Sequence, residues 1–444
     1  MSPGPSREPA GLPRAPRVFR NPDRYHRRAA PDAPPPRQRG RRRTPAPDRG
    51  SALILYGAAL AYFTSIGAGI PTLPRYLVGP LHGSGVTVGI AVASFSVGAI
   101  AARLPVGAAA DRWGWRRRSL LVTGATVLAT STALLVAAPS PPAVFALRAL
   151  AGIADALFYT AAAATAYELA PAGRAGAAVS HFTMAAYLGL LAGPVLGETL
   201  RALFGFGWVW AGATAAAGAA ALLAALLPVQ APRPDRQPRA PDNTGPGRHL
   251  VPRGALVPGV VLLVSTLGVA GYNSFVALYA SSLGQRDARL EFAVFAIVTL
   301  LVRAAGGRLL DGHRLEPLLR ATLGLSATGL LLIALLRTPV GLLVGTVVFA
   351  VGQAPTFPAL IALTAARVPA ARRAAAVATL TTCFDLAYGA AAFALGALWQ
   401  RAGFPALWLA AAAAALTGSV LLTVGPPAPL PPPPNPTPDR GGAT

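Results

Sequence analysis

The chain has 444 residues, of which 53% are hydrophobic and only 12% are charged. Soluble domains carry about a quarter charged residues, so this composition argues against a soluble globular protein. The net charge is +23 and every one of the 39 basic residues is arginine. Nucleic-acid binding is one explanation of such an excess, but in a membrane protein the positive-inside rule explains it more simply, and we expect no nucleic-acid partner.

Residues 1–50 are rich in proline and arginine and predict a disordered cytoplasmic tail. Twelve apolar segments follow, close to the ~20 residues needed to cross a ~30 Å hydrocarbon core. A transmembrane barrel would need ~10-residue alternating segments, which we do not find. The segments are expected at about 52–70, 86–106, 119–138, 143–167, 176–197, 203–227, 256–280, 290–305, 318–336, 339–366, 374–398 and 404–424.

A linker divides these segments six and six. We expect an N-terminal bundle at 51–228, a cytoplasmic linker at 229–255, a C-terminal bundle at 256–424 and a disordered Pro-rich tail at 425–444. With the N-terminus inside, the cytoplasmic connections hold 16 arginines and the opposite face holds 6. The bias predicts a multi-pass protein of the cell membrane with both termini cytoplasmic. The arginine-only, Ala-rich composition suggests a GC-rich bacterial genome.

One pattern of residues occurs twice, 200 positions apart. An R-x3-G-x3-D frame places Arg103, Gly107 and Asp111 over Arg303, Gly307 and Asp311. A shared frame in two halves of one hydrophobic chain indicates an internal repeat. The plainer interpretation of either copy alone is a positively charged cytoplasmic loop that happens to contain Gly and Asp.

The first copy resembles the signature loop of the major facilitator superfamily, G-x3-D-R-x-G-x-R between the second and third helices. The matching residues are Gly107, Asp111, Arg112, Gly114 and Arg116, and the second copy adds Arg314 but has Gly312 in place of the basic residue. The resemblance implies an all-α fold of two six-helix bundles built from inverted repeats, with substrate at the midplane. It also implies that both copies, with Arg103 and Arg303, act as conformational latches.

The fourth segment carries the strongest candidates for proton coupling. Arg148, Gly152, Asp155 and Tyr159 are spaced to share one helical face. Charged residues inside a span are costly and face the bundle interior, and burial favours protonation of a carboxyl group. Arg148 with Gly152 resembles the family's R-x3-G motif, which is linked to proton transfer. The alternative is a structural Arg148–Asp155 ion pair.

The fifth segment places Gly189, Gly193, Pro194 and Gly197 along one face. This resembles the G-P-x-x-G part of a motif found mainly in the family's exporters, although Glu198 stands where a second glycine is expected. Ordinary packing of small residues between helices is the alternative. His181 is a further candidate proton carrier, or a structural histidine near a helix end.

Asp385, in the eleventh segment, is the only acid deep in the C-terminal half. It is a second proton-coupling candidate, with a structural, hydrogen-bonded acid as the alternative. Aromatic and amide side chains are candidates to line the substrate cavity or simply to pack. They are Tyr62, Tyr159, Tyr272, Asn273 and Gln353.

Motifs for nucleotide hydrolysis or a catalytic nucleophile are missing, and the five histidines and the single Cys383 form no metal-ligand pattern. We therefore expect no enzyme and no cofactor beyond the proton as coupling ion. The reading we favour is a monomeric secondary transporter that exports a small organic compound, such as a drug or natural product, in exchange for protons. The alternatives are a proton-coupled uptake permease of the same fold and a non-transporting membrane sensor or scaffold.

Overall fold

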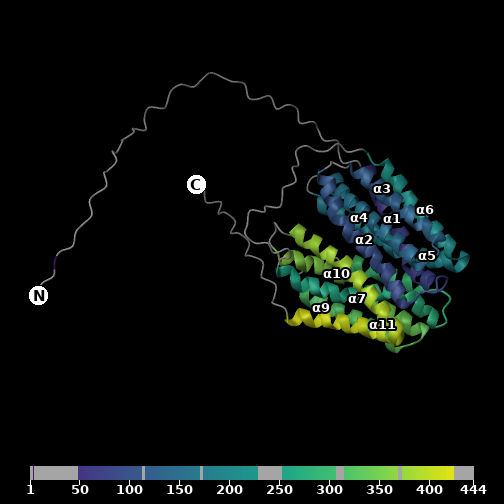
Figure 1. Ribbon diagram of the computed structural model, residues 1–444. Coiled ribbons are helices and arrows are strands. Elements are labelled where there is room, and N and C mark those ends of the chain that lie inside the picture. Colours follow the sequence, from purple (N-terminus) through teal and green to yellow (C-terminus); the bar gives the residue numbers. More distant parts are fainter. Residues whose placement is uncertain are drawn as a thin grey trace, which may run out of the picture. The chain divides into compact units, whose positions relative to one another are not determined.

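A computed structural model describes residue 4 and residues 49–112, 116–170, 174–228, 253–306, 315–368 and 373–424. The described part of the chain is almost entirely α-helical and contains no strand. Helices suit a membrane because all their backbone hydrogen bonds are made within the segment. The α-helices, most of which are labelled in Figure 1, are α1 (Arg49–Val78), α2 (Gly85–Arg112), α3 (Arg117–Leu134), α4 (Pro141–Leu169), α5 (Ala175–Phe204), α6 (Phe206–Leu226), α7 (Arg253–Ser282), α8 (Arg289–Gly306), α9 (Leu315–Leu335), α10 (Pro339–Ala366) and α11 (Arg373–Val424).

Among the described residues, ten stretches are long and apolar enough to cross a membrane. The last of them, Thr379–Thr423, has 45 residues, enough for two crossings. It bends at Gly403, whose φ of 76° lies in the left-handed region. The 18-residue α8 adds a short amphipathic helix with Arg289 and Arg303 at its ends. The all-helical membrane fold is confirmed, and the helices are compatible with twelve crossings.

The observed helices differ from the predicted segments mainly at their ends. α2 continues to Arg112, six residues beyond the predicted end at 106, so the first part of the repeated frame is helical rather than a turn. The predicted terminal tails and most of the 229–255 linker lie outside the described residues. The domain boundaries therefore stay predictions.

The six connections on one face of the molecule are short and described in full. Backbone turns with positive φ occur there at His82, Gly205, Gly284 and Gly403. The other two connections lead into α4 and α10, each of which begins with a proline, which is well placed in the first turn of a helix. We call this face, where α1, α5 and α7 end, the closed face, because hydrogen bonds and backbone contacts join the two halves there.

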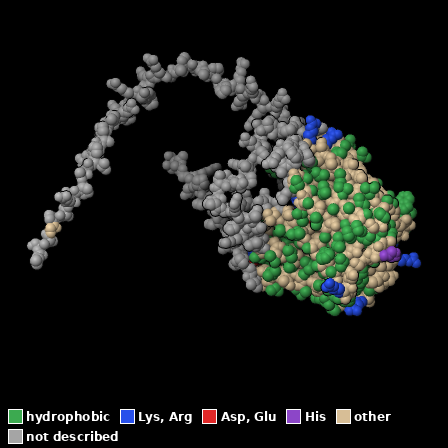
Figure 2. Space-filling model, in the orientation of Figure 1, with side chains coloured by type: hydrophobic (Ala, Val, Ile, Leu, Met, Phe, Trp, Pro, Cys, Tyr) green, Lys and Arg blue, Asp and Glu red, His purple; other side chains and the backbone are tan. Residues whose placement is uncertain are grey.

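Each half packs through close helix pairs, α1 with α5 and α2 with α4 in the first half, and α7 with α11 and α9 with α10 in the second. The halves meet where α2 packs on α11, with smaller contacts between α1 and α7 and between α5 and α8. Hydrophobic side chains dominate the face seen in Figure 2, with basic residues near its margins. This distribution is that of a bundle whose outer surface faces lipid.

The internal repeat is visible in two ion pairs whose partners are both 51 positions apart. Arg117, at the start of α3, lies 2.7 Å from Glu168, at the end of α4. Glu316, at the start of α9, lies 2.6 Å from Arg367, just after α10. The two pairs occupy corresponding places in the halves with their charges exchanged. The attraction is kept although each side chain has changed sign, which supports the predicted repeat.

Candidate functional site

The site is centred on Arg103, which extends from α2 between two carboxylates. Its Nη1 lies 2.6 Å from Oδ2 of Asp385 on α11, and its Nη2 lies 3.9 Å from Oδ2 of Asp155 on α4. The three side chains are only 23, 24 and 13% exposed, respectively. Arg103 and Asp155 belong to the N-terminal half and Asp385 to the C-terminal half, so one guanidinium joins acids from both halves.

Arg303, the second arginine of the repeated frame, also reaches across between the halves. It extends from α8, and its guanidinium carbon lies 3.8 Å from the centre of the Tyr187 ring on α5. This is a cation–π contact. Arg103 and Arg303 thus make related contacts, each from the second helix of one half to the fifth helix of the other. Sequence patterns marked these arginines as parts of latch loops, but did not indicate what they contact.

Arg148 is not paired with Asp155, although both lie on α4. Its guanidinium carbon lies 4.7 Å from the centre of the Phe95 ring of α2. Its buried Nε has no hydrogen-bond partner among the described residues. The structural Arg148–Asp155 pair considered above is therefore not the arrangement observed, because Arg103 takes the place beside Asp155.

The cavity candidates fall into different environments. Tyr62 is fully buried and stacks on Phe158, with ring centres 3.9 Å apart, and its hydroxyl has no partner among the described residues. Tyr159 is 37% exposed. Tyr272 is fully buried and its hydroxyl lies 3.1 Å from Oγ1 of Thr346, so it packs in the core of its half rather than lining an open space.

The remaining two candidates, Asn273 and Gln353, are half-buried. The amide of Asn273 donates a hydrogen bond to the hydroxyl of Tyr388 on α11 at 3.2 Å. Gln353 makes no hydrogen bond or ion pair that we find among the described residues.

The glycines of the fifth segment bring α5 against α1. A Cβ at Gly189 would lie 2.5 Å from the Leu60 carbonyl oxygen, and one at Gly197 would lie 2.4 Å from that of Ala68. Gly193 meets the Cα of Gly67 in the same way, and Pro194 lies within α5. Small-residue packing is thus what these positions do locally. His181 is exposed, with its ring 6.0 Å from that of Tyr56.

For most of the predicted latch residues, the structure does not describe the side chain or the whole residue. Gly107, Asp111 and Arg112 lie in α2, but their side chains are outside the described residues, as is Gly114. Arg116 is exposed at the start of α3. Gly307, Asp311 and Arg314 lie outside the described part of the chain. The latch role stays a prediction.

One cluster of charges was missed as a site. Glu198 of α5 is fully buried and pairs with both Arg75 of α1 and Arg201 one helical turn away. In the sequence, Glu198 appeared only as a departure from a glycine motif, and the arginines only as loop charges. A signal was available, because an acid inside an apolar helix requires a nearby cation.

Chemically, the centre offers carboxylates that bind or release protons next to a cation that joins the halves. Within the described residues, no group of three His, Cys, Asp or Glu side chains is placed to hold a metal ion. The arrangement therefore suits the coupling of proton binding to contact between the halves.

The chain matches the family described as the Major Facilitator Superfamily over residues 55–285 and 259–443. It is 29% identical to an uncharacterized MFS-type transporter of Salmonella typhimurium over 392 residues, covering 84% of this chain and 96% of the relative. It is 28% identical to an uncharacterized MFS-type transporter of Burkholderia mallei over 415 residues, with coverages of 86 and 94%.

Solved structures share the fold at low identity. The nucleoside transporter NupG superposes with a TM-score of 0.69 at 17% identity, covering 84% of this chain and 99% of that one. A bacterial homolog of the human lysosomal transporter Spinster, in an inward-facing and unoccupied conformation, superposes with a TM-score of 0.68 at 14% identity, with coverages of 85 and 95%. Fold, repeat and match together place this chain in the Major Facilitator Superfamily.

Proposed function

We propose that this protein exports a small organic compound across the cell membrane in exchange for protons, by alternating access between its two halves. The observation that carries the proposal is the position of Arg103 between Asp155 and Asp385, acids of opposite halves. Ionisable groups inside membrane spans are costly, and they typically mark ion or substrate pathways.

The charges of this cluster give the coupling a physical basis. With both acids ionised, the three side chains carry a net charge of −1, and one bound proton makes the cluster neutral. Arg103 and Asp155 lie in the same half, so they stay together when the halves move. Protonation of Asp385 would remove the ionic bond from Arg103 to the other half. Proton binding would thereby change how firmly the halves are joined at this depth.

Export rather than uptake is supported by the glycine–proline pattern of α5 and its resemblance to the exporter motif. The solved structures of similar fold include a nucleoside transporter and a human organic anion transporter, MFSD10. The test therefore covers more than one class of compound. An uptake permease with the same proton chemistry is the second candidate, because the contacts of Arg103 do not depend on the direction of transport.

The test uses everted membrane vesicles acidified inside and a panel of fluorescent dyes of different charge. An exporter accumulates a dye inside such vesicles only while the proton gradient lasts, whereas an uptake permease does not. Asp155→Asn and Asp385→Asn are each expected to abolish gradient-driven accumulation while the protein still folds. Glu168→Gln is the matched control, because this acid also pairs with an arginine but lies at a helix end.

Accumulation that survives in Asp155→Asn would contradict the assigned proton role. A protein that moves no dye, nucleoside or organic anion in purified liposomes would instead favour a sensor or scaffold.

A further inference from the structure

A polar network that the proton chemistry does not use surrounds Glu198 near the end of α5. Glu198 is fully buried, and one carboxylate oxygen, Oε2, accepts hydrogen bonds from Arg75 and Arg201. The same oxygen accepts a hydrogen bond of 2.9 Å from the backbone N–H of Ala288, which belongs to the C-terminal half. Hydrogen bonds from arginine to a carboxylate are among the stronger ones in proteins, and here they converge with a donor from the other half on one oxygen.

Both arginines also bond across to the other half. Nη2 of Arg75 donates to the carbonyl oxygen of Ala277 at 2.5 Å and to Oγ of Ser281 at 3.0 Å. Nη2 of Arg201 donates to the carbonyl oxygen of Arg286 at 2.8 Å. The N-terminal half thus supplies all three charged side chains, and the C-terminal half supplies neutral partners at the end of α7 and in the α7–α8 connection.

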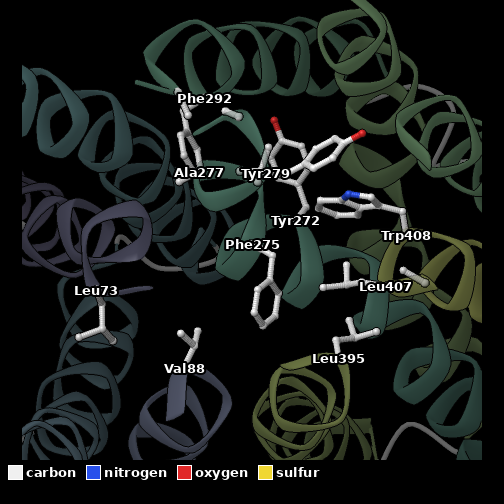
Figure 3. Close-up of a cluster of buried hydrophobic side chains, with 14 of the residues drawn as sticks. Leu73, Val88, Tyr272, Phe275, Ala277, Tyr279, Phe292, Leu395, Leu407 and Trp408 are labelled. Atoms are coloured by element: carbon white, nitrogen blue, oxygen red, sulfur yellow. The ribbon is translucent and has the colours of Figure 1, made fainter. Parts of the chain in front are cut away.

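The network lies on the face where the halves are in closest contact. Five hydrogen bonds between described residues of the two halves lie at this face. A Cβ at Gly85 would lie 2.3 Å from the carbonyl oxygen of Gly396, so α2 and α11 meet backbone to backbone here. Leu73 and Val88 from the first half share an apolar cluster with Phe275 and Leu395 from the second (Figure 3).

The contacts of Arg103 and Arg303 lie deeper, away from this face. We propose that Glu198 is the organising residue of a gate that closes this side of the transport pathway in one state and opens in the other. The proposal rests on the proposed function, since a gate of this kind is needed only if the halves alternate. In the orientation predicted from the arginine counts, the gate is extracellular.

Such a gate is able to open because the ion-paired side chains all belong to the N-terminal half. The ion pairs of Glu198 with Arg75 and Arg201 lie within one half, so they survive when the halves separate. The hydrogen bonds that must break lead to neutral partners, and water replaces those at nearly balanced free energy. Asp287 of the C-terminal half also attracts Arg75 and Arg201, but it pairs with Arg289 of its own half and keeps that partner when the halves separate. An ion pair formed between the halves would instead leave two separated charges. Glu198 therefore holds the two arginines in position without preventing their release.

The test measures access to the closed face without using any substrate, so a failure of the proposed export would not disturb it. In a Cys383→Ser background, Ala277→Cys places a thiol at a position that is fully buried in the gate. Purified protein in nanodiscs is treated with a water-soluble maleimide, and the labelling rate is measured. Arg337→Cys, at an exposed position in the α9–α10 connection on the same face, provides the reference for full access.

Glu198→Gln leaves Arg75 and Arg201 without their counter-charge and is expected to raise the labelling rate of Ala277→Cys by about tenfold, the change that corresponds to ~1.4 kcal/mol in the equilibrium between closed and open forms. Glu198→Asp keeps the charge and should give an intermediate rate. Glu168→Gln, which removes an acid from an ion pair remote from the gate, should leave the rate unchanged.

Arg201→Gln covers the case in which Glu198→Gln does not fold, because it leaves the Arg75–Glu198 pair intact and removes one bond to the other half. A smaller but measurable rise is expected from it. Unchanged labelling of Ala277→Cys in these variants, with normal labelling at Arg337→Cys, would overturn the gate. An equal rise in Glu168→Gln would also overturn it, since the effect would then reflect general loosening.

Discussion

Substitution of Gly152 by alanine tests whether close packing of α2 and α4 holds the central charges in place. A Cβ at Gly152 would lie 2.0 Å from the Phe95 carbonyl oxygen and 2.8 Å from the Ala99 backbone nitrogen. Real Cβ atoms essentially never come within 3.0 Å of such atoms, so the two helices must move apart at this point. The obstructing atoms are backbone and cannot rotate away.

Overpacking of this kind costs about 1–3 kcal/mol. The separation also acts on the site, because Arg103 on α2 and Asp155 on α4 are already 3.9 Å apart, near the limit of an ion pair. We expect Gly152→Ala to lower the apparent melting temperature of the purified protein by about 3–8 °C and to reduce gradient-driven dye accumulation. The assays are a fluorescence melt in detergent and the everted-vesicle measurement.

Gly324→Ala is the matched control, because a Cβ at this helical glycine of α9 meets nothing within 4 Å. There, alanine should be neutral or stabilising by up to ~1 kcal/mol, since it restricts the unfolded chain and favours helix. Equal melting temperatures for Gly152→Ala and Gly324→Ala would refute the packing argument. A destabilised Gly152→Ala with full transport would instead refute its link to the central charges.

Three further expectations concern stability and are measured by the same melts. Tyr272→Phe should lower the free energy of unfolding by about 0.5–1.5 kcal/mol, because the Tyr272 hydroxyl is hydrogen-bonded. Tyr62→Phe should leave it unchanged, because the Tyr62 hydroxyl is buried with no partner among the described residues; equal losses in the two variants would contradict this. Arg117→Glu should destabilise the protein, and adding Glu168→Arg should recover about 0.2–1 kcal/mol by restoring the pair in reverse; no recovery would mean that the pair contributes nothing. Gly403→Ala forces alanine to a φ of 76° and should cost about 1–2 kcal/mol, so an unchanged melt would argue against this bend in α11.

The repeated frame shows both the power and the limit of sequence patterns. Its 200-residue spacing predicted two related halves, and the helices and the two 51-residue ion pairs agree with that arrangement. The same pattern placed the residues after 106 in a cytoplasmic loop, whereas α2 runs on to Arg112. Arg103 lies inside this helix, and its side chain reaches the acids. Helix ends are poorly marked where small residues and arginines continue an apolar run.

Asp155 and Asp385 were recognisable as candidates because an acid in an apolar span needs an explanation. Their shared partner was not recognisable. Arg148 is the nearest cation to Asp155 in sequence and lies on the same helical face, yet it packs on Phe95 instead. Helical spacing says which residues share a face, but not the rotamer or the neighbouring helix that decides which charges meet.

By itself, the sequence determined that this is a helical membrane protein, roughly how many times it crosses, that it is duplicated, and which buried charges need partners. These properties depend on local composition, periodicity and spacing. Only the tertiary structure decided that Arg103 joins Asp155 to Asp385, and that Glu198 organises contacts reaching Ala288, 90 positions away. Such pairings follow from how closely glycines let the helices approach and from the low dielectric of the interior, which makes an unpaired buried charge costly.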